Sequence, residues 1–237
     1  MVQVPESILK AVTKYVRASA VSNGGSCSWH FSQMYGKVAK TIGAHEVSED
    51  GICEMLSAFY MERHKRCSSL ETYVTPHGKP GGLDLSKIRQ IMQLFIMGNT
   101  MSPNSMIGND YWSTGSDQDL ATRVWLKAKG LKERETFRAS RGGGSRSGFG
   151  IKLGTELAKA SSKAPYVLIG IHGPDSGHAM AVSFLKDVRF FDPNFGEFTF
   201  PTPGQFGSWF GILWGKFYGR KVLGANQSDS YEFFTYV

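Results

Sequence analysis

The last third of the chain holds a series of short apolar segments separated by turn residues, and this pattern restricts the fold more than any other feature. Gly, Pro or Asp residues bound the segments, which is typical of strands joined by turns. The series predicts an antiparallel meander. Its expected strands are residues 166–172, 179–185, 187–191, 197–200 and 231–237.

Helical periodicity dominates the residues before this region. Apolar positions repeat at helical spacing in residues 5–18 and 52–66, and further helices are expected at 29–42, after Asp84 and at 118–129. Helices followed by a meander predict an α+β fold in which N-terminal helices pack on an antiparallel β-sheet, rather than a doubly wound parallel sheet. Aromatic residues between 206 and 217 also recur at helical spacing. We expect them in the core, although the same stripe would suit a membrane-docking helix.

We divide the chain into an N-terminal helical arm or extension, residues 1–47, and a main domain, residues 48–237. Within the main domain, residues 132–150 are basic and rich in glycine, which predicts a mobile surface loop. No Lys-Ser or Lys-Thr pair closes the glycine run, so it fits no phosphate-binding P-loop. Its arginines are nevertheless candidates for contact with an anionic partner: Arg134, Arg138, Arg141 and Arg146.

Composition excludes several classes of protein. Hydrophobic residues make up 41% and charged residues 20% of the chain, which excludes wholesale disorder. No segment approaches the ~20 consecutive apolar residues of a membrane-spanning helix, and charged residues interrupt the apolar pattern of residues 1–21, so a cleavable Sec signal is not expected. The net charge of +7 is compatible with a nucleic acid, an anionic lipid or an acidic protein as partner, and does not choose among them.

The cysteines point to thiol chemistry rather than to a disulfide framework. Cys27, Cys53 and Cys67 are odd in number and form no CxxC pair, so at least one thiol is free and a cysteine-rich zinc site lacks ligands. The histidines form no HExxH or His-x-His motif, so no metal is expected.

Cys53 lies where a glycine turn leads into the helix expected at 52–66. A thiol in the first helical turn faces unsatisfied backbone N–H groups and the positive end of the helix dipole, and both favour the thiolate. The same N–H groups can stabilise an oxyanion. A buried structural cysteine is the alternative interpretation.

His178 and Asp192 are expected to meet at one edge of the sheet. His178 opens one predicted strand, and Asp192 ends the next, where Pro193 stops it. Consecutive antiparallel strands bring the start of one beside the end of the other. A carboxylate beside a histidine fixes its tautomer and leaves the second ring nitrogen free to pair with a thiol. A strand-capping histidine and a turn-forming aspartate are the alternatives.

A cysteine at a helix start, followed by His and Asp on a later sheet, is the chain order of papain-like enzymes. The segments GICEMLSAFY, SGHAMAVSF and FFDPNFGEFTF resemble the nucleophile helix and the His and Asp strands of the YopT/AvrPphB-type bacterial effector cysteine proteases. The resemblance covers residues 48–62 and 164–237. It implies a papain-like fold with Cys53 as nucleophile, His178 as general base and then acid, and Asp192 as the orienting carboxylate.

The sequence departs from the family pattern at one point. Papain-like enzymes place an Asn or Gln a few residues before the nucleophile to complete the oxyanion hole, whereas this chain reads HEVSEDGIC there. Ser48 or backbone N–H groups alone would have to substitute. Cys27, in GGSCSWH, is the rival nucleophile, and Cys67 follows a basic run at a helix end, where the dipole disfavours a thiolate.

The resemblance implies a thiol endopeptidase, a virulence effector or toxin that is secreted or injected into a host cell without a cleavable Sec signal and cleaves host proteins. It implies no cofactor. Two alternative functions remain, one that uses the same catalytic residues for another reaction and one that involves no catalysis. One is a papain-fold amidase, deamidase or acyltransferase, for example one directed at peptidoglycan, and the other is a non-enzymatic module that binds an anionic partner.

Overall fold

The computed structural model describes residues 4–44, 52–76, 82–100, 117–140, 146–172, 177–218 and 230–237. Its helices are α1 (Glu6–Ser22), α2 (Gly36–Ile42), α3 (Cys53–Lys65), α4 (Leu70–Val74), α5 (Leu85–Thr100), α7 (Asp117–Ala128), α8 (Arg146–Ala160), α9 (Pro203–Leu213) and the π-helical turn η2 (Trp214–Tyr218). The strands are β1 (Ser26–Trp29), β2 (Glu133–Ser140), β3 (Tyr166–His172), β4 (Gly177–Ser183), β5 (Val188–Asp192), β6 (Gly196–Phe200) and β7 (Ser230–Tyr236).

In the described part of the chain the strands form one seven-stranded sheet in the order β1-β6-β5-β4-β3-β7-β2, and every neighbouring pair is antiparallel. Strands β3 to β6 form the predicted meander. Strand β7 adds beside β3, while β1 and β2 close the two edges. The fold is therefore the expected α+β arrangement of helices on an antiparallel sheet.

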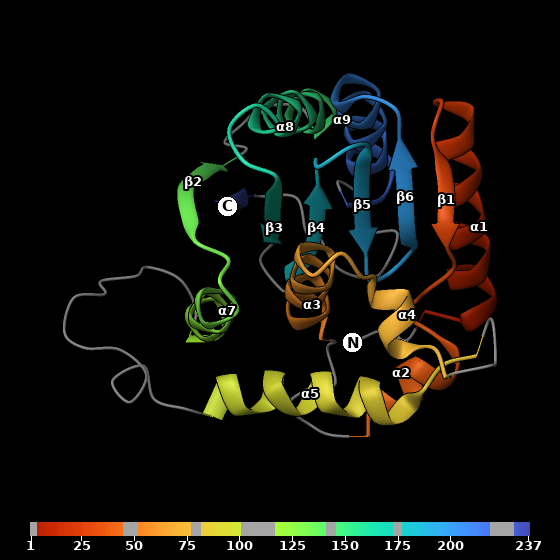
Figure 1. The fold of residues 1–237 in the computed structure, drawn as a ribbon. Coiled ribbons are helices and arrows are strands. Elements are labelled where there is room, and N and C mark those ends of the chain that lie inside the picture. Colours follow the sequence, from red (N-terminus) through yellow and green to blue (C-terminus); the bar gives the residue numbers. More distant parts are fainter. Residues whose placement is uncertain are drawn as a thin grey trace.

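Helices cover both faces of the sheet (Figure 1). One core cluster joins α8 and α9 to β3 and β5 through Leu153, Trp209, Ile169 and Phe190. The other joins α3 and α5 to β3 and β4 through Leu56, Ile88, Leu168 and Ala181. This division follows from the strand period of two, because successive side chains of β3 point to opposite faces.

Aromatic packing holds β5 firmly under α9. The ring of Phe190 meets Trp209 at 5.7 Å and Phe210 at 5.4 Å between centroids, both edge-on, the preferred geometry for aromatic pairs. The aromatic stripe of α9 is therefore core, as expected, with Trp209 and Phe210 fully buried. The packing fixes the strand that ends in Asp192.

Two expectations about local structure are wrong. Residues 29–42 were expected to form one helix, but Trp29 ends β1, and only Gly36–Ile42 is helical. Residues 132–150 were expected to form a loop, but residues 133–140 are β2 and α8 begins at Arg146. Exposed and partly buried residues alternate along β2, and Arg134 and Arg138 are among the exposed ones, as on an edge strand whose charges protect it from further pairing.

Strand β1, which lies within the first 47 residues, belongs to the same sheet as the later strands. Strand β1 pairs with β6, with Cys27 opposite Phe198. The aromatic ring of Trp29 stacks on Phe191 of β5, with centroids 5.8 Å apart. The domain boundary at residues 47 and 48 stays a prediction.

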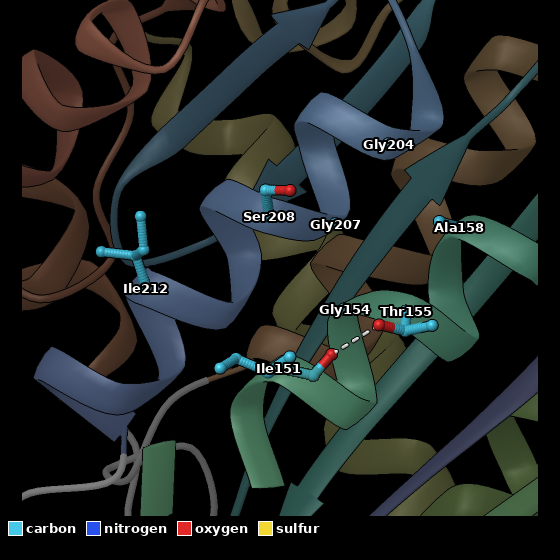
Figure 2. Close-up of a pocket in the computed structure, with 8 residues that line it drawn as sticks. All are labelled: Ile151, Gly154, Thr155, Ala158, Gly204, Gly207, Ser208 and Ile212. Carbon is cyan, nitrogen blue, oxygen red and sulfur yellow. Dashed lines mark hydrogen bonds between the residues drawn. The ribbon is translucent and has the colours of Figure 1, made fainter. Parts of the chain in front are cut away.

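Helices α8 and α9 cross at a contact that only glycine allows. A Cβ atom on Gly154 would lie 2.0 Å from the backbone oxygen of Gly207, and one on Gly207 would lie 2.4 Å from that of Gly154. Figure 2 shows the two helices at this crossing, with Ile151 and Ile212 beside the pocket that they line. The close approach of the two backbones sets the separation between α8 and α9.

Replacing Gly154 with alanine is expected to lower the free energy of unfolding by about 1–3 kcal/mol, because the helices must separate to admit the methyl group. Denaturant unfolding measures the change. Gly204→Ala is the matched control, because a Cβ atom there meets nothing within 4 Å. It should leave stability unchanged or raise it by up to about 1 kcal/mol through helix propensity. Equal effects of the two substitutions would contradict this description of the crossing.

Candidate active site

Cys53 is the first residue of α3, and its sulfur lies against β4. The backbone N–H of Ala179 donates to the Cys53 Sγ at 3.4 Å. One turn further along the same helix face, the Ser57 hydroxyl donates to the carbonyl oxygen of Ala179 at 3.2 Å. Residues four apart on a helix share a face, so α3 contacts both polar groups of a single β4 residue. These contacts hold the thiol, which is partly exposed, at the start of β4.

His178 and Asp192 are neighbours, as the strand order predicts. The His178 Nε2 atom lies 2.9 Å from Asp192 Oδ1, and both side chains are almost completely buried. The pair forms because β4 and β5 are adjacent and antiparallel, with Ala181 opposite Phe191. The start of β4 therefore lies beside the end of β5.

The Asp192 carboxylate receives two further hydrogen bonds. The backbone N–H of Asn194 donates to Oδ1 at 2.8 Å, and the Tyr218 hydroxyl donates to Oδ2 at 2.5 Å. The Tyr218 ring also stacks on the imidazole of His178, with centroids 5.3 Å apart and an angle of 21° between the planes. Tyr218 ends the π-helical turn η2, a local geometry that recurs at functional sites. One aromatic residue thus contacts both partners of the pair.

The protonation states of Cys53 and His178 depend on each other. Burial alone raises the pKa of the Cys53 thiol, but the hydrogen bond and charge of His178, with the N–H groups of Ala179 and Glu54, outweigh burial and lower it. Burial alone lowers the pKa of His178, but Asp192 and then Cys53 outweigh it and raise the pKa to about 10. Both shifts favour a thiolate beside an imidazolium, and the two titrations belong to the pair.

Tyr218 stays a hydrogen-bond donor across this range. Burial and then the negative charge of Asp192 raise the pKa of its hydroxyl well above the usual value. The neutral phenol therefore keeps its proton and directs it at Oδ2. The carboxylate, in turn, keeps a full set of donors although it has no access to solvent.

The start of α3 is suited to stabilising negative charge. The N-cap residue Ile52 provides no side-chain cap, so its side chain takes up none of the N–H groups of the first turn. Together with the helix dipole, these groups form the electrostatic arrangement expected around an oxyanion. Ser48, named as a substitute for the missing amide, lies outside the described residues.

The other two cysteines lie elsewhere. Cys27 is on edge strand β1, and burial chiefly raises the pKa of its thiol, opposite to what a nucleophile needs. Its Sγ faces the carbonyl oxygen of Trp29 at 3.6 Å. Cys67 is exposed just after α3 and has a positive φ of 55°. The Cys53 sulfur, by contrast, accepts a hydrogen bond from the residue next to His178, and His178 lowers its pKa.

Two of the four arginines named for an anionic partner make contacts within the fold. The Arg134 guanidinium donates to the carbonyl oxygen of Lys163 at 2.6 Å, and Arg138 pairs with Glu232 at 2.8 Å. Arg141 lies outside the described residues, and α8 begins at Arg146.

Among the described residues, no group of three or more His, Cys, Asp or Glu could hold a metal ion. None of the described helices combines the length and hydrophobicity that crossing a membrane requires.

Sequence reasoning missed three residues around the triad candidates: Gln33, Asn194 and Tyr218. Asn194 carried a signal, since it follows Asp192 and Pro193 in a turn. Gln33 carried none, because its segment was assigned to a helix. Tyr218 was hidden because a π-helical turn shifts the helical phase of the aromatic stripe.

Comparison with known proteins places the chain among virulence proteins of bacteria. The model of the family Peptidase C58, described as Yersinia/Haemophilus virulence surface antigen, matches residues 17–232. The cysteine protease YopT of Yersinia pestis is 29% identical over 230 residues, which are 93% of this chain and 67% of that protein. The cysteine protease yopT1 of Yersinia enterocolitica is 30% identical over 233 residues, which are 94% of this chain and 68% of that protein.

A solved structure is similar in fold. The Pseudomonas avirulence protein AvrPphB matches with a TM-score of 0.55 at 19% identity, over 81% of this chain and 95% of that one. This likeness shows that the chain has the expected papain-like fold.

Tyr218→Phe isolates the hydroxyl from the ring, since phenylalanine keeps the stack on His178 and loses only the bond to Asp192. A buried carboxylate oxygen is then left without its donor. We expect the free energy of unfolding to fall by about 1–3 kcal/mol, and the reactivity of Cys53 with iodoacetamide at neutral pH to fall as well.

Tyr73→Phe is the matched control for Tyr218→Phe. The Tyr73 hydroxyl donates to Gln90 at 3.0 Å in an exposed position, away from Asp192. That substitution should change neither quantity measurably. Wild-type stability and thiol reactivity in Tyr218→Phe would contradict the role given to the hydroxyl.

Proposed function

Because the chain belongs to the Peptidase C58 family and is a cysteine protease, we propose that Cys53, His178 and Asp192 form its catalytic triad and that it cleaves host proteins as a virulence effector. One observation carries the proposal. His178 is hydrogen-bonded to Asp192, and the residue after it, Ala179, donates its backbone N–H to the Cys53 sulfur at the start of α3. This arrangement supports the order thiol, imidazole, carboxylate that nucleophilic catalysis by a thiol uses.

Each residue has a chemical role that follows from its contacts. Cys53 attacks the carbonyl carbon of a peptide bond as a thiolate, and the carbonyl oxygen takes up the negative charge. N–H groups at the start of α3 stabilise that charge. Asp192 holds the His178 ring by Nε2, so that the other ring nitrogen faces the sulfur and carries the proton to be transferred.

The reaction then proceeds in two steps, formation of the acyl-enzyme and its hydrolysis. His178 donates its proton to the leaving nitrogen, the C–N bond breaks, and an acyl thioester on Cys53 remains. His178, now neutral, takes a proton from water, whose oxygen attacks the thioester carbon. The C–S bond breaks, the acid product leaves, and the thiolate–imidazolium pair is restored.

The virulence setting supports a substrate and a location. The family description names a virulence antigen, and the relatives are named cysteine proteases, which supports host proteins as substrates and secretion or injection as the route to them. An anionic partner at Arg134, Arg138, Arg141 and Arg146 stays a prediction, and the fold itself occupies Arg134 and Arg138.

Cys53→Ala is expected to abolish proteolysis and leave the fold intact, because a small, partly exposed thiol contributes little packing. Target cells are exposed to the wild type and to the variant, and new protein N-termini are compared by mass spectrometry. Cys27→Ala is the matched control and should keep the wild-type set of cleavages. Cleavage retained in Cys53→Ala and lost in Cys27→Ala would move the nucleophile to Cys27.

A further inference from the structure

The segment 30–35, which joins β1 to α2, runs between the Asp192 turn and the start of α3. The backbone N–H of Gln33 donates to the carbonyl oxygen of Pro193 at 2.8 Å. The Arg17 guanidinium of α1 joins the segment to the residues after Asp192, because it donates to the carbonyl oxygens of Phe31 at 3.2 Å and Phe195 at 3.0 Å. The segment is therefore attached to the turn that follows Asp192.

The Gln33 side chain reaches both halves of the site. Its Oε1 atom accepts the backbone N–H of Ile52, the residue before Cys53, at 3.3 Å. Its Nε2 atom donates to the Asn194 Oδ1 at 3.0 Å. The backbone N–H of Asn194 donates in turn to the Asp192 oxygen that faces His178. A chain of hydrogen bonds thus leads from the residue before the nucleophile to the carboxylate.

We propose that Gln33 is a positioning residue of the protease, whose amide sets the start of α3, and with it the Cys53 sulfur, at a fixed place relative to the His178–Asp192 pair. The inference rests on the proposed triad. Gln33 itself acts through Ile52 and Asn194, and its described contacts do not include the sulfur.

An amide is the side chain that this position requires. Ile52 offers a donor, and Asn194 offers an acceptor, so the bridging group must accept at one atom and donate at the other. Methionine has a similar length and shape but provides neither of these hydrogen bonds. Placement errors of about 1 Å at a catalytic centre can cost on the order of a hundredfold in rate, so a bridge of this kind has a functional consequence.

The test is the pH dependence of Cys53 alkylation by iodoacetamide in the full chain, followed by mass spectrometry of the peptide that contains Cys53. In Gln33→Met we expect the midpoint of the profile to move upward by about one pH unit, which lowers the rate on the acid side about tenfold. Gln90→Met is the matched control, because Gln90 accepts a hydrogen bond from Tyr73 in an exposed position away from the site. It should keep the wild-type profile.

This readout separates positioning from general stability. A variant that only loosened the fold would unfold at a lower temperature without moving the profile of the folded protein. If Gln33→Met does not fold, Asn194→Ala breaks the same bridge from its other end and keeps the backbone N–H that donates to Asp192. The same upward shift is expected there.

The outcomes distinguish the inference from its premise. If Gln33→Met folds and keeps the wild-type pH profile of Cys53 alkylation, the role of Gln33 is overturned and the proposed triad is unaffected. The same holds for Asn194→Ala where it replaces Gln33→Met. A wild-type Cys53 that titrates like an ordinary thiol overturns the proposed triad, and the inference falls with it.

Discussion

The buried carboxylate of Asp192 is the constraint on which the rest of the site depends. A carboxylate without solvent is strongly destabilising unless donors satisfy both oxygens. Here the donors come from three places in the chain: the imidazole of His178 on β4, the backbone of Asn194 in the turn after β5, and the hydroxyl of Tyr218 in η2. The hydrogen bonds that the Asp192 carboxylate needs therefore fix the orientation of the His178 ring. The ring in turn stabilises the thiolate form of Cys53.

The fold supplies the geometry that this requirement needs. The meander brings the start of β4 to the end of β5, and the aromatic packing of Phe190 under α9 holds β5 in place. On the other face, Cys53 and Ser57 of α3 contact Ala179 through its N–H and its carbonyl. The nucleophile, at the start of α3, thus contacts the β4 residue that follows His178. Gln33 links the residue before Cys53 to the turn after Asp192.

The sequence was sufficient to predict the meander, α3 with Cys53 at its start, and the contact between His178 and Asp192, because strand period, helix start and strand order are local or nearly local signals. The edge strands were missed for physical reasons. Strand β1 is short, and β2 carries charges in place of apolar residues, since an edge strand is half solvated. Gln33 and Tyr218 could not be found, because their contacts join segments that are distant along the chain.

The central claim is that Cys53 and His178 exist as a thiolate–imidazolium pair, and the ultraviolet absorbance of the thiolate tests it most directly. The difference between wild type and Cys53→Ala across pH isolates this thiol from Cys27 and Cys67. Since the pKa of Cys53 is lowered and that of His178 is raised to about 10, the difference signal should appear at a lower pH than the signal of an ordinary thiol. In His178→Ala it should move to higher pH. A signal that appears only above the ordinary thiol pKa, and is indifferent to His178→Ala, would contradict the account.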